Sequence, residues 1–224
     1  MALNVKILPS LLAADFGHLA DEARRAEACG ADALHIDIMD GHFVPNLSMG
    51  PDVVTMARAA VKIPLSVHLM LTHPDRYVAP FSKAGASTIL VHVEADGDVA
   101  ATLRQIRAAG CVPGITLNPE TPAERVFPFL ADAEEVLCMT VHPGYGGQKF
   151  MAEILPKIRA VRDRLTQLGR PLDIMVDGGI NAETAAACAR HGANAFVAGV
   201  ALFRAPDMAA EIARMRERAR QVSA

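Results

Sequence analysis

The chain has 224 residues, of which 51% are hydrophobic and 21% charged, and its formal net charge is −3 at pH 7. This charge, the absence of Trp and an aromatic content of 4% exclude the basic surface and the stacking platforms of a nucleic-acid-binding protein. Apolar stretches fall well short of the ~20 residues that cross a bilayer, so we expect no membrane partner, no nucleic-acid partner and a cytoplasmic location.

Short apolar runs alternate with alanine-rich helical patterns from one end of the chain to the other. Continuous apolar runs are typical of parallel strands that are buried on both faces. We therefore predict eight strands, over residues 6–9, 33–38, 65–70, 88–93, 112–117, 135–141, 172–176 and 195–198.

A helical pattern follows each predicted strand. Asp15, Asp98 and Asn181 stand where an N-terminal cap is needed, and Pro156 marks the start of the longest helix. We predict eight helices, over residues 16–29, 52–60, 74–84, 98–109, 121–130, 152–168, 181–190 and 206–220.

Eight such units in one chain correspond to about 28 residues each, close to the size of a βαβ unit. A (β/α)8 barrel has a lower limit of roughly 200 residues, so this barrel would have little room for insertions. The alternative is an open doubly wound sheet, but the first strand lacks the glycine triplet of a dinucleotide-binding fold. We predict an α/β protein with a (β/α)8 TIM barrel fold, as a single catalytic domain over residues 1–224.

The four cysteines, Cys29, Cys111, Cys138 and Cys188, are scattered and contain no CxxC pair. This spacing fits neither a zinc ribbon nor a disulfide framework. We expect buried, reduced thiols.

Polar residues gather at the predicted carboxyl ends of the strands, which is where barrel enzymes place their chemistry. The opposite strand ends are predicted to be mostly apolar or loop-like. The polar residues at the carboxyl ends are Ser10, His35, Asp37, Asp40, His68, His92, Glu94, Asn118, His142 and Asp177.

Four of these residues predict a metal site. His35 and Asp37 are two apart and share one face of their strand, His68 lies on the next strand, and Asp177 lies on the seventh. A single such histidine is more often structural, but four buried polar groups need partners. Two imidazoles and two carboxylates suit one divalent cation, namely Zn²⁺, Fe²⁺, Mn²⁺ or Co²⁺.

Glycines cluster after the last three strands, as HPGYGGQK from His142, as DGGIN from Asp177 and as Gly199 before Val200. Glycine lets backbone N–H groups approach phosphate oxygens, and the loops after strands seven and eight form the usual phosphate site of barrels. For the first cluster, turn geometry alone is an equally good explanation. Met39, Met70 and Met139, near three strand ends, predict either an apolar cap over a reacting centre or core packing.

Seven segments resemble the ribulose-phosphate 3-epimerase family across the whole chain. They are LPSLLAADF (8–16), HIDIMDGHFVPNLSMGP (35–51), VHLM (67–70), LNPETP (117–122), MTVHPGYGGQKF (139–150), VDGGIN (176–181) and FVAGVALF (196–203). The resemblance implies a barrel that interconverts D-ribulose 5-phosphate and D-xylulose 5-phosphate with one divalent metal cation, by proton transfer between two carboxylates through an enediolate. It implies a phosphorylated ketopentose as substrate, and we also expect a homo-oligomer.

The resemblance further implies roles for individual residues. The metal ligands would be His35, Asp37, His68 and Asp177, with Asp37 and Asp177 as the catalytic acid–base pair. Substrate contacts fall at Ser10, His68, Gly144, Tyr145, Gly146, Gly147, Asp177, Gly178, Gly179, Gly199 and Val200. Met39, Met70 and Met139 match the family's methionine cap.

The chain departs from the family pattern at two positions. His142 stands where Asn is common, and Val200 stands where Ser is common. The second change removes a hydroxyl at the phosphate end, although the backbone N–H of Val200 can still donate.

Four other functions compete with this one. An allulose-6-phosphate epimerase would share the barrel, the metal and the carboxylates. A class I aldolase needs a Schiff-base lysine at a carboxyl strand end, but Lys6 begins a strand and Lys149 follows a glycine loop. A related barrel decarboxylase would want a lysine beside Asp37, which Ile36 and Ile38 flank instead. A non-catalytic sugar-phosphate binding protein would need neither a metal nor paired acids.

Overall fold

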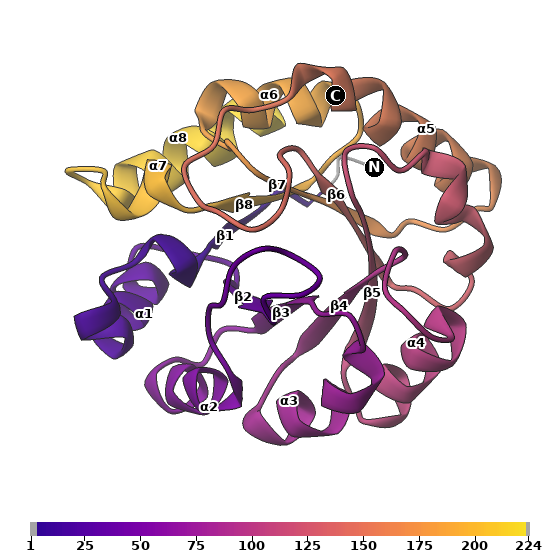
Figure 1. Cartoon of the computed structure of the whole chain (residues 1–224). Coiled ribbons are helices and arrows are strands. Elements are labelled where there is room, and N and C mark those ends of the chain that lie inside the picture. The colour runs from indigo at the N-terminus through magenta and orange to yellow at the C-terminus, as the bar shows by residue number, and fades with distance from the viewer. Residues whose placement is uncertain (1–3, 223–224) are drawn as a thin grey trace.

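The computed structural model describes residues 4–222 as one ring of eight parallel strands inside a ring of helices (Figure 1). The strands follow the order β1-β8-β7-β6-β5-β4-β3-β2. The predicted (β/α)8 barrel is therefore confirmed. The strands are β1 (Lys6–Pro9), β2 (Leu34–Met39), β3 (Leu65–Met70), β4 (Thr88–His92), β5 (Val112–Leu117), β6 (Glu135–Met139), β7 (Asp173–Asp177) and β8 (Ala195–Ala198).

The helices cover the outer face of the barrel (Figure 1). Asp98 and Asn181 cap two of them as predicted, and Asn181 forms a reciprocal capping box with Thr184. No helix within residues 4–222 has both the length and the apolar character to cross a membrane. The helices are α1 (Leu19–Ala28), α2 (Pro51–Ala60), α3 (Val78–Ala84), α4 (Val99–Ala108), α5 (Leu155–Gln167), α6 (Ala182–Arg190), α7 (Val200–Phe203) and α8 (Met208–Arg220).

The seam between β1 and β2 closes the barrel through fewer backbone contacts than its other joints. Ser10 and His35 form an isolated parallel bridge at the carboxyl end of the seam. At the other end, the Asp32 carboxylate accepts a hydrogen bond from the Ile7 N–H at 2.7 Å, and the Asp32 N–H donates to the Ile7 carbonyl at 3.0 Å. The Asp32 carboxylate and the Ser10–His35 bridge thus complete the joint between β1 and β2, which regular strand pairing leaves incomplete.

The apolar core has two layers. The larger layer lies between the sheet and the helices, and the smaller one fills the barrel interior with residues such as Leu8, Leu90, Leu137 and Val197. Gly114 of β5 makes room for one of them, because a Cβ there would lie 2.1 Å from Leu90 Cδ2. The interior is therefore a packed core and not a pore, as in other barrels of this size.

The helix predicted over residues 121–130 is wrong. Two 3-10 turns, Ala123–Arg125 and Phe127–Phe129, take its place. Pro128 explains the difference, because it has no N–H to donate to the carbonyl four residues earlier and its ring clashes with that carbonyl. The alternation is also uneven at the end of the chain, where β8 is followed by both α7 and α8.

The thiols are free, and three of the four are buried as predicted. Cys29 is the exception, being only partly buried. Burial raises the pKa of Cys138 and of Cys188 to about 12, so both stay protonated and chemically inert near neutral pH.

The amino ends of the strands are more polar than predicted. Lys6 Nζ lies 2.6 Å from Asp173 Oδ2, and Asn194 Nδ2 donates to Asp173 Oδ1 at 2.5 Å. Glu135 belongs to this end of the barrel, and its Oε2 is buried without a hydrogen-bond partner among the described residues. The prediction of mostly apolar strand ends was wrong here, because the inward-facing positions of three strands carry charge.

The buried carboxyl of Glu135 predicts a pH-dependent stability. Burial raises its pKa from an ordinary 4.5 to about 7, with a smaller opposing effect from Lys6. The native protein then holds a proton that the unfolded chain releases, so stability falls as the pH rises from about 4.5 to about 7. We expect Glu135→Gln to raise the free energy of unfolding by up to about 3 kcal/mol at pH 8 and by little at pH 4.5.

Urea denaturation at the two pH values measures this difference. Glu134→Gln is the matched control, because Glu134 is exposed and pairs only with Arg107 at 3.1 Å among the ion pairs of the described chain. An equal gain at both pH values, or a gain from Glu134→Gln as large as that from Glu135→Gln, would contradict the burial argument.

Candidate functional site

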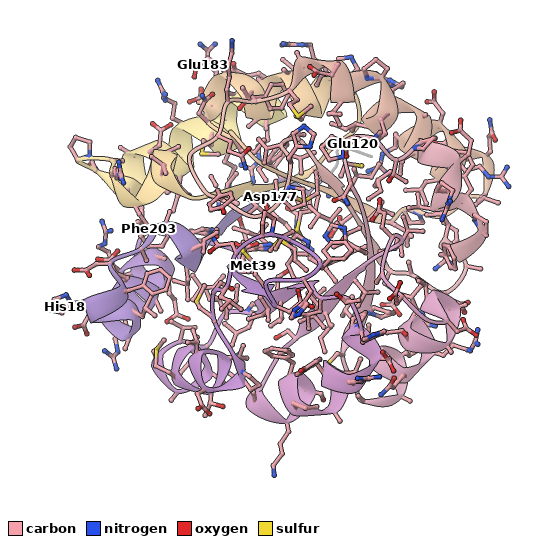
Figure 2. All side chains as sticks on the ribbon, viewed as in Figure 1. His18, Met39, Glu120, Asp177, Glu183 and Phe203 are labelled. Carbon is pink, nitrogen blue, oxygen red and sulfur yellow. The ribbon has the colours of Figure 1, made fainter. Side chains whose placement is uncertain are left out.

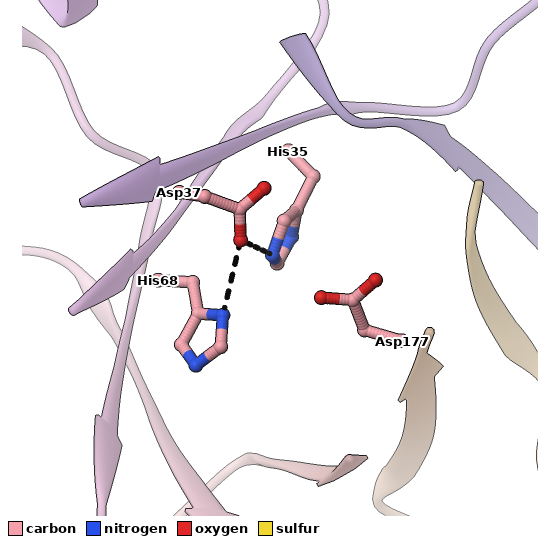
Figure 3. Close-up of side chains that lie close together, drawn as sticks. All are labelled: His35, Asp37, His68 and Asp177. Carbon is pink, nitrogen blue, oxygen red and sulfur yellow. Dashed lines mark hydrogen bonds and ion pairs between the residues drawn. The ribbon is translucent and has the colours of Figure 1, made fainter. Parts of the chain in front are cut away.

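Four side chains converge at the carboxyl end of the barrel (Figure 3). His35 and Asp37 come from the interior face of β2, His68 comes from β3, and Asp177 ends β7. One ligand atom from each lies within 4.8 Å of the other three. The predicted convergence of these four side chains is therefore observed, because the two-residue spacing and the strand ends determine where they point.

The distances among these atoms suit ligands of one shared cation. Asp37 Oδ1 lies 3.4 Å from His35 Nε2 and 3.3 Å from His68 Nδ1. Charge-assisted hydrogen bonds are shorter, at about 2.7–2.9 Å. The edge between two ligand atoms of a tetrahedral zinc site is roughly 3.3 Å, given bonds of about 2.0–2.1 Å.

His35 supports the same interpretation. Its ring is fully buried, and neither ring nitrogen has a hydrogen-bond partner within residues 4–222. A buried polar atom without a partner is costly, so it commonly marks the place of an ion or ligand. Two imidazoles and two carboxylates are a suitable donor set for Zn²⁺, Fe²⁺, Mn²⁺ or Co²⁺.

The two carboxyl groups differ in charge. Burial, and then the negative charge of Asp37, raises the pKa of Asp177 to about 7. Burial also acts to raise the pKa of Asp37, but His35 and His68 outweigh it and hold that pKa well below its usual range. Near neutral pH, Asp37 is ionised while Asp177 can carry a proton, which is the separation that acid–base pairs require.

Ser10 orients one of these carboxylates. Its hydroxyl donates to Asp37 Oδ2 at 2.6 Å and accepts from the Leu12 N–H at 3.3 Å. The other Asp37 oxygen is left facing the two imidazoles. Ser10 thus holds the Asp37 carboxylate in place and also forms part of the cavity wall.

A cavity of about 600 Å³ lies over the four side chains. Figure 2 shows Asp177 and Met39 near the centre of the ring of helices, with His18, Glu183 and Phe203 toward its rim. His35 and His68 do not line the cavity, because both are completely buried beneath it. The other sequence-predicted site residues do line it: Ser10, Asp37, Met39, Met70, Met139, Gly144, Tyr145, Gly146, Gly147, Asp177, Gly178, Gly179, Gly199 and Val200.

The glycine loops come together at one side of this cavity. A Cβ on Gly147 would lie 3.7 Å from Val200 Cγ2, and a Cβ on Gly179 would lie 2.5 Å from the Phe150 nitrogen. Gly178 and Gly179 have φ values of +119° and +64°, where a side chain is strained. Close backbone contact between loops therefore requires glycine here.

The loops after β2 and β6 are tied together across the barrel mouth. Asn46 Nδ2 donates to the Gly144 carbonyl at 2.7 Å, and the Tyr145 hydroxyl donates to the Pro45 carbonyl at 2.8 Å. A turn at the first glycine cluster could form without these two hydrogen bonds between the loops. They fix the first glycine cluster over the cavity.

The three methionines occupy two packing clusters. Met39 and Met70 pack with Val44, whereas Met139 packs with the barrel interior. All three are almost fully buried and line the cavity. Core packing therefore describes these side chains, and the cap over a reacting centre stays a prediction.

Of the two departures from the family pattern, only Val200 lines the cavity. His142 is exposed, and its Nδ1 lies 2.6 Å from Glu120 Oε1. His92 and Glu94 are polar strand-end residues without a predicted role, and hydrogen bonds connect both of them to His68. Among the described cavity residues, Lys149 is the one that carries a positive charge.

Fold and site together define a barrel enzyme that acts on a small molecule at the carboxyl ends of its strands. A family model described as "Ribulose-phosphate 3 epimerase family" matches residues 6–203. The chain belongs to this family, and it is accordingly an isomerase that acts as a carbohydrate epimerase.

Curated relatives agree with this assignment. The chain is 45% identical over 213 residues to a ribulose-phosphate 3-epimerase of Bacillus subtilis, covering 95% of this chain and 98% of the relative. It is 48% identical over 221 residues to a cytoplasmic isoform of the same enzyme from Oryza sativa, covering 96% and 95%.

Solved structures at low identity support the fold alone. KGPDC from Streptococcus mutans superposes with a TM-score of 0.72 at 13% identity, covering 99% of this chain and all of the other. A 3-hexulose-6-phosphate synthase gives a TM-score of 0.67 at 22% identity, covering 97% of this chain and 99% of the other.

Proposed function

We propose that this chain interconverts D-ribulose 5-phosphate and D-xylulose 5-phosphate, as one catalytic domain with one divalent cation. The observation that carries the proposal is the pair of carboxyl groups from β2 and β7, of opposite protonation preference, at the floor of one cavity. Epimerisation beside a ketone removes a proton from one face of a carbon and returns one to the opposite face. Two carboxyl groups that approach from different strands suit this task better than one.

In this proposal Asp37 accepts the proton and Asp177 donates one, through an enediolate, and the roles reverse for the other epimer. Ser10 keeps the Asp37 carboxylate in place through its 2.6 Å hydrogen bond. His35, Asp37, His68 and Asp177 would hold the cation. When bound, a divalent cation supplies Lewis-acid stabilisation of the negative charge that develops on the substrate.

The other parts of the cavity take the ends of the substrate. Backbone N–H groups of Gly146, Gly147, Gly179 and Val200 receive the phosphate, because glycine permits close approach and Val200 keeps its N–H. Met39, Met70 and Met139 exclude water above the reacting carbon, which strengthens electrostatic stabilisation there. The other predicted contacts that line the cavity, from Ser10, Gly144, Tyr145, Gly178 and Gly199, complete the binding site, whereas His68 is buried beneath the cavity and would act as a ligand of the cation.

We also propose a cytoplasmic location and a homo-oligomeric state. The name of the Oryza sativa relative supports the first proposal. The second stays a prediction from the sequence, which light scattering on the purified protein tests.

A metal-resolved assay tests the proposed activity. The protein is stripped with a chelator, reloaded singly with Zn²⁺, Fe²⁺, Mn²⁺ or Co²⁺, and assayed with D-ribulose 5-phosphate and with the six-carbon D-allulose 6-phosphate. We expect turnover with at least one cation and at least a tenfold preference in kcat/KM for the five-carbon sugar. A preference for the six-carbon sugar would overturn the substrate assignment, and full activity after chelation would overturn the metal site.

A further inference from the structure

A line of hydrogen bonds runs outward from His68, away from the cavity. His68 Nε2 lies 2.8 Å from His92 Nε2, and His92 Nδ1 lies 3.1 Å from Glu94 Oε2. The other oxygen, Glu94 Oε1, accepts a hydrogen bond from the Asn118 N–H at 2.9 Å. Neither His92 nor Glu94 lines the cavity, so this line cannot act by touching a substrate there.

The order of partners fixes the position of each proton. A carboxylate only accepts hydrogen bonds, so His92 carries its proton on Nδ1 and directs it to Glu94. The Nε2 of a neutral His92 is then an acceptor, and His68 must donate to it from its own Nε2. This leaves a lone pair on His68 Nδ1, the atom that faces Asp37 Oδ1 at 3.3 Å.

The rings are also held in orientation. His68 and His92 stack at 5.0 Å between centroids with 20° between their planes. Phe43 covers the same His92 ring at 4.7 Å. Both imidazoles are fully buried, so water does not compete for their nitrogens.

We propose that His92 and Glu94 are positioning residues that select the His68 tautomer with a free Nδ1 lone pair, so that His68 can bind a divalent cation. The inference rests on the proposed metal site. Without this line, His68 can instead place its proton on Nδ1 and donate it to Asp37, which blocks the lone pair. His35 has no comparable support, since neither of its ring nitrogens has a hydrogen-bond partner within the described chain.

Two variants test the proposal. Glu94→Gln places an amide against two donors. With the amide oxygen toward the Asn118 N–H, that bond is kept, while the NH2 faces His92 and reverses the bond between residue 94 and His92 and the bond between His92 and His68. His92→Phe keeps the ring shape and removes both nitrogens. We expect each variant to bind Zn²⁺ and Co²⁺ about 10–100-fold more weakly than the unmodified protein, measured by competition with a chromophoric chelator.

The second readout is the tautomer itself. Proton–nitrogen correlation spectra of ¹⁵N-histidine-labelled, metal-free protein are expected to show His68 protonated on Nε2 in the unmodified protein and on Nδ1 in Glu94→Gln. Glu120→Gln is the matched control, because Glu120 lies 2.6 Å from an exposed histidine, His142, and makes no ion pair with a candidate ligand. It should change neither the metal affinity nor the His68 spectrum.

The outcomes separate the two proposals. If both variants keep their Zn²⁺ affinity within twofold and His68 stays protonated on Nε2, the positioning role is overturned while the metal site stands. If the unmodified protein binds none of the four cations, the metal site itself is overturned. Thermal unfolding of the metal-free variants checks folding, and Glu94→Gln alone decides the question if His92→Phe does not fold.

Discussion

Replacing Asp37 or Asp177 by asparagine is expected to slow epimerisation by about 10³-fold in both directions. An amide cannot accept the proton from carbon or deliver one to it. The surroundings of the two carboxyl groups agree with separate roles as base and acid, because Asp37 stays ionised and the pKa of Asp177 rises to about 7. Initial rates from both epimers, with metal content measured in parallel, quantify the loss.

Solvent exchange distinguishes a two-carboxylate mechanism from a general loss of function. In D2O, a variant that keeps one carboxylate is expected to exchange the C3 hydrogen of one epimer while no longer forming the other epimer. The two variants should differ in which epimer they exchange. Glu120→Gln, an exposed carboxylate on the same face of the barrel, is the control and should retain normal rates. Near-normal epimerisation by both asparagine variants would refute the mechanism.

Gly179→Ala is expected to lower the free energy of unfolding by about 2–4 kcal/mol and to raise KM at least tenfold. The φ of Gly179 is +64°, and an added Cβ would lie 2.5 Å from the Phe150 nitrogen and 3.0 Å from the Gln148 carbonyl oxygen. These are backbone atoms, so the loop after β6 must move. That movement displaces the N–H groups proposed to bind phosphate.

Gly146→Ala is the matched control for stability. Gly146 belongs to the same set of loops, but its φ is not in the left-handed region and an added Cβ would meet nothing within 4 Å. Its urea midpoint should stay close to that of the unmodified protein. If Gly179→Ala matches Gly146→Ala in stability and the unmodified protein in KM, the close loop contact has no energetic role.

The strands were predictable because most are short and largely apolar runs. The convergence of the four proposed ligands was predictable because strand ends and a two-residue spacing fix the direction of their side chains. The segment 121–130 was not, because its apolar spacing is helical while Pro128 prevents the helix. The charged amino ends were missed because only the register shows that Lys6, Glu135 and Asp173 approach one another. The role of His92 depends on ring orientation, which no spacing along the chain encodes.

The way the ring closes has a consequence for synthesis on the ribosome. β1 pairs with β8, Lys6 opposite Ala195 and Pro9 opposite Ala198, and the four convergent side chains come from β2, β3 and β7. A nascent chain halted after β6 therefore has an unpaired β1 edge and lacks Asp177. The full set of four proposed cation ligands is therefore present only late in translation, once β7 has been made.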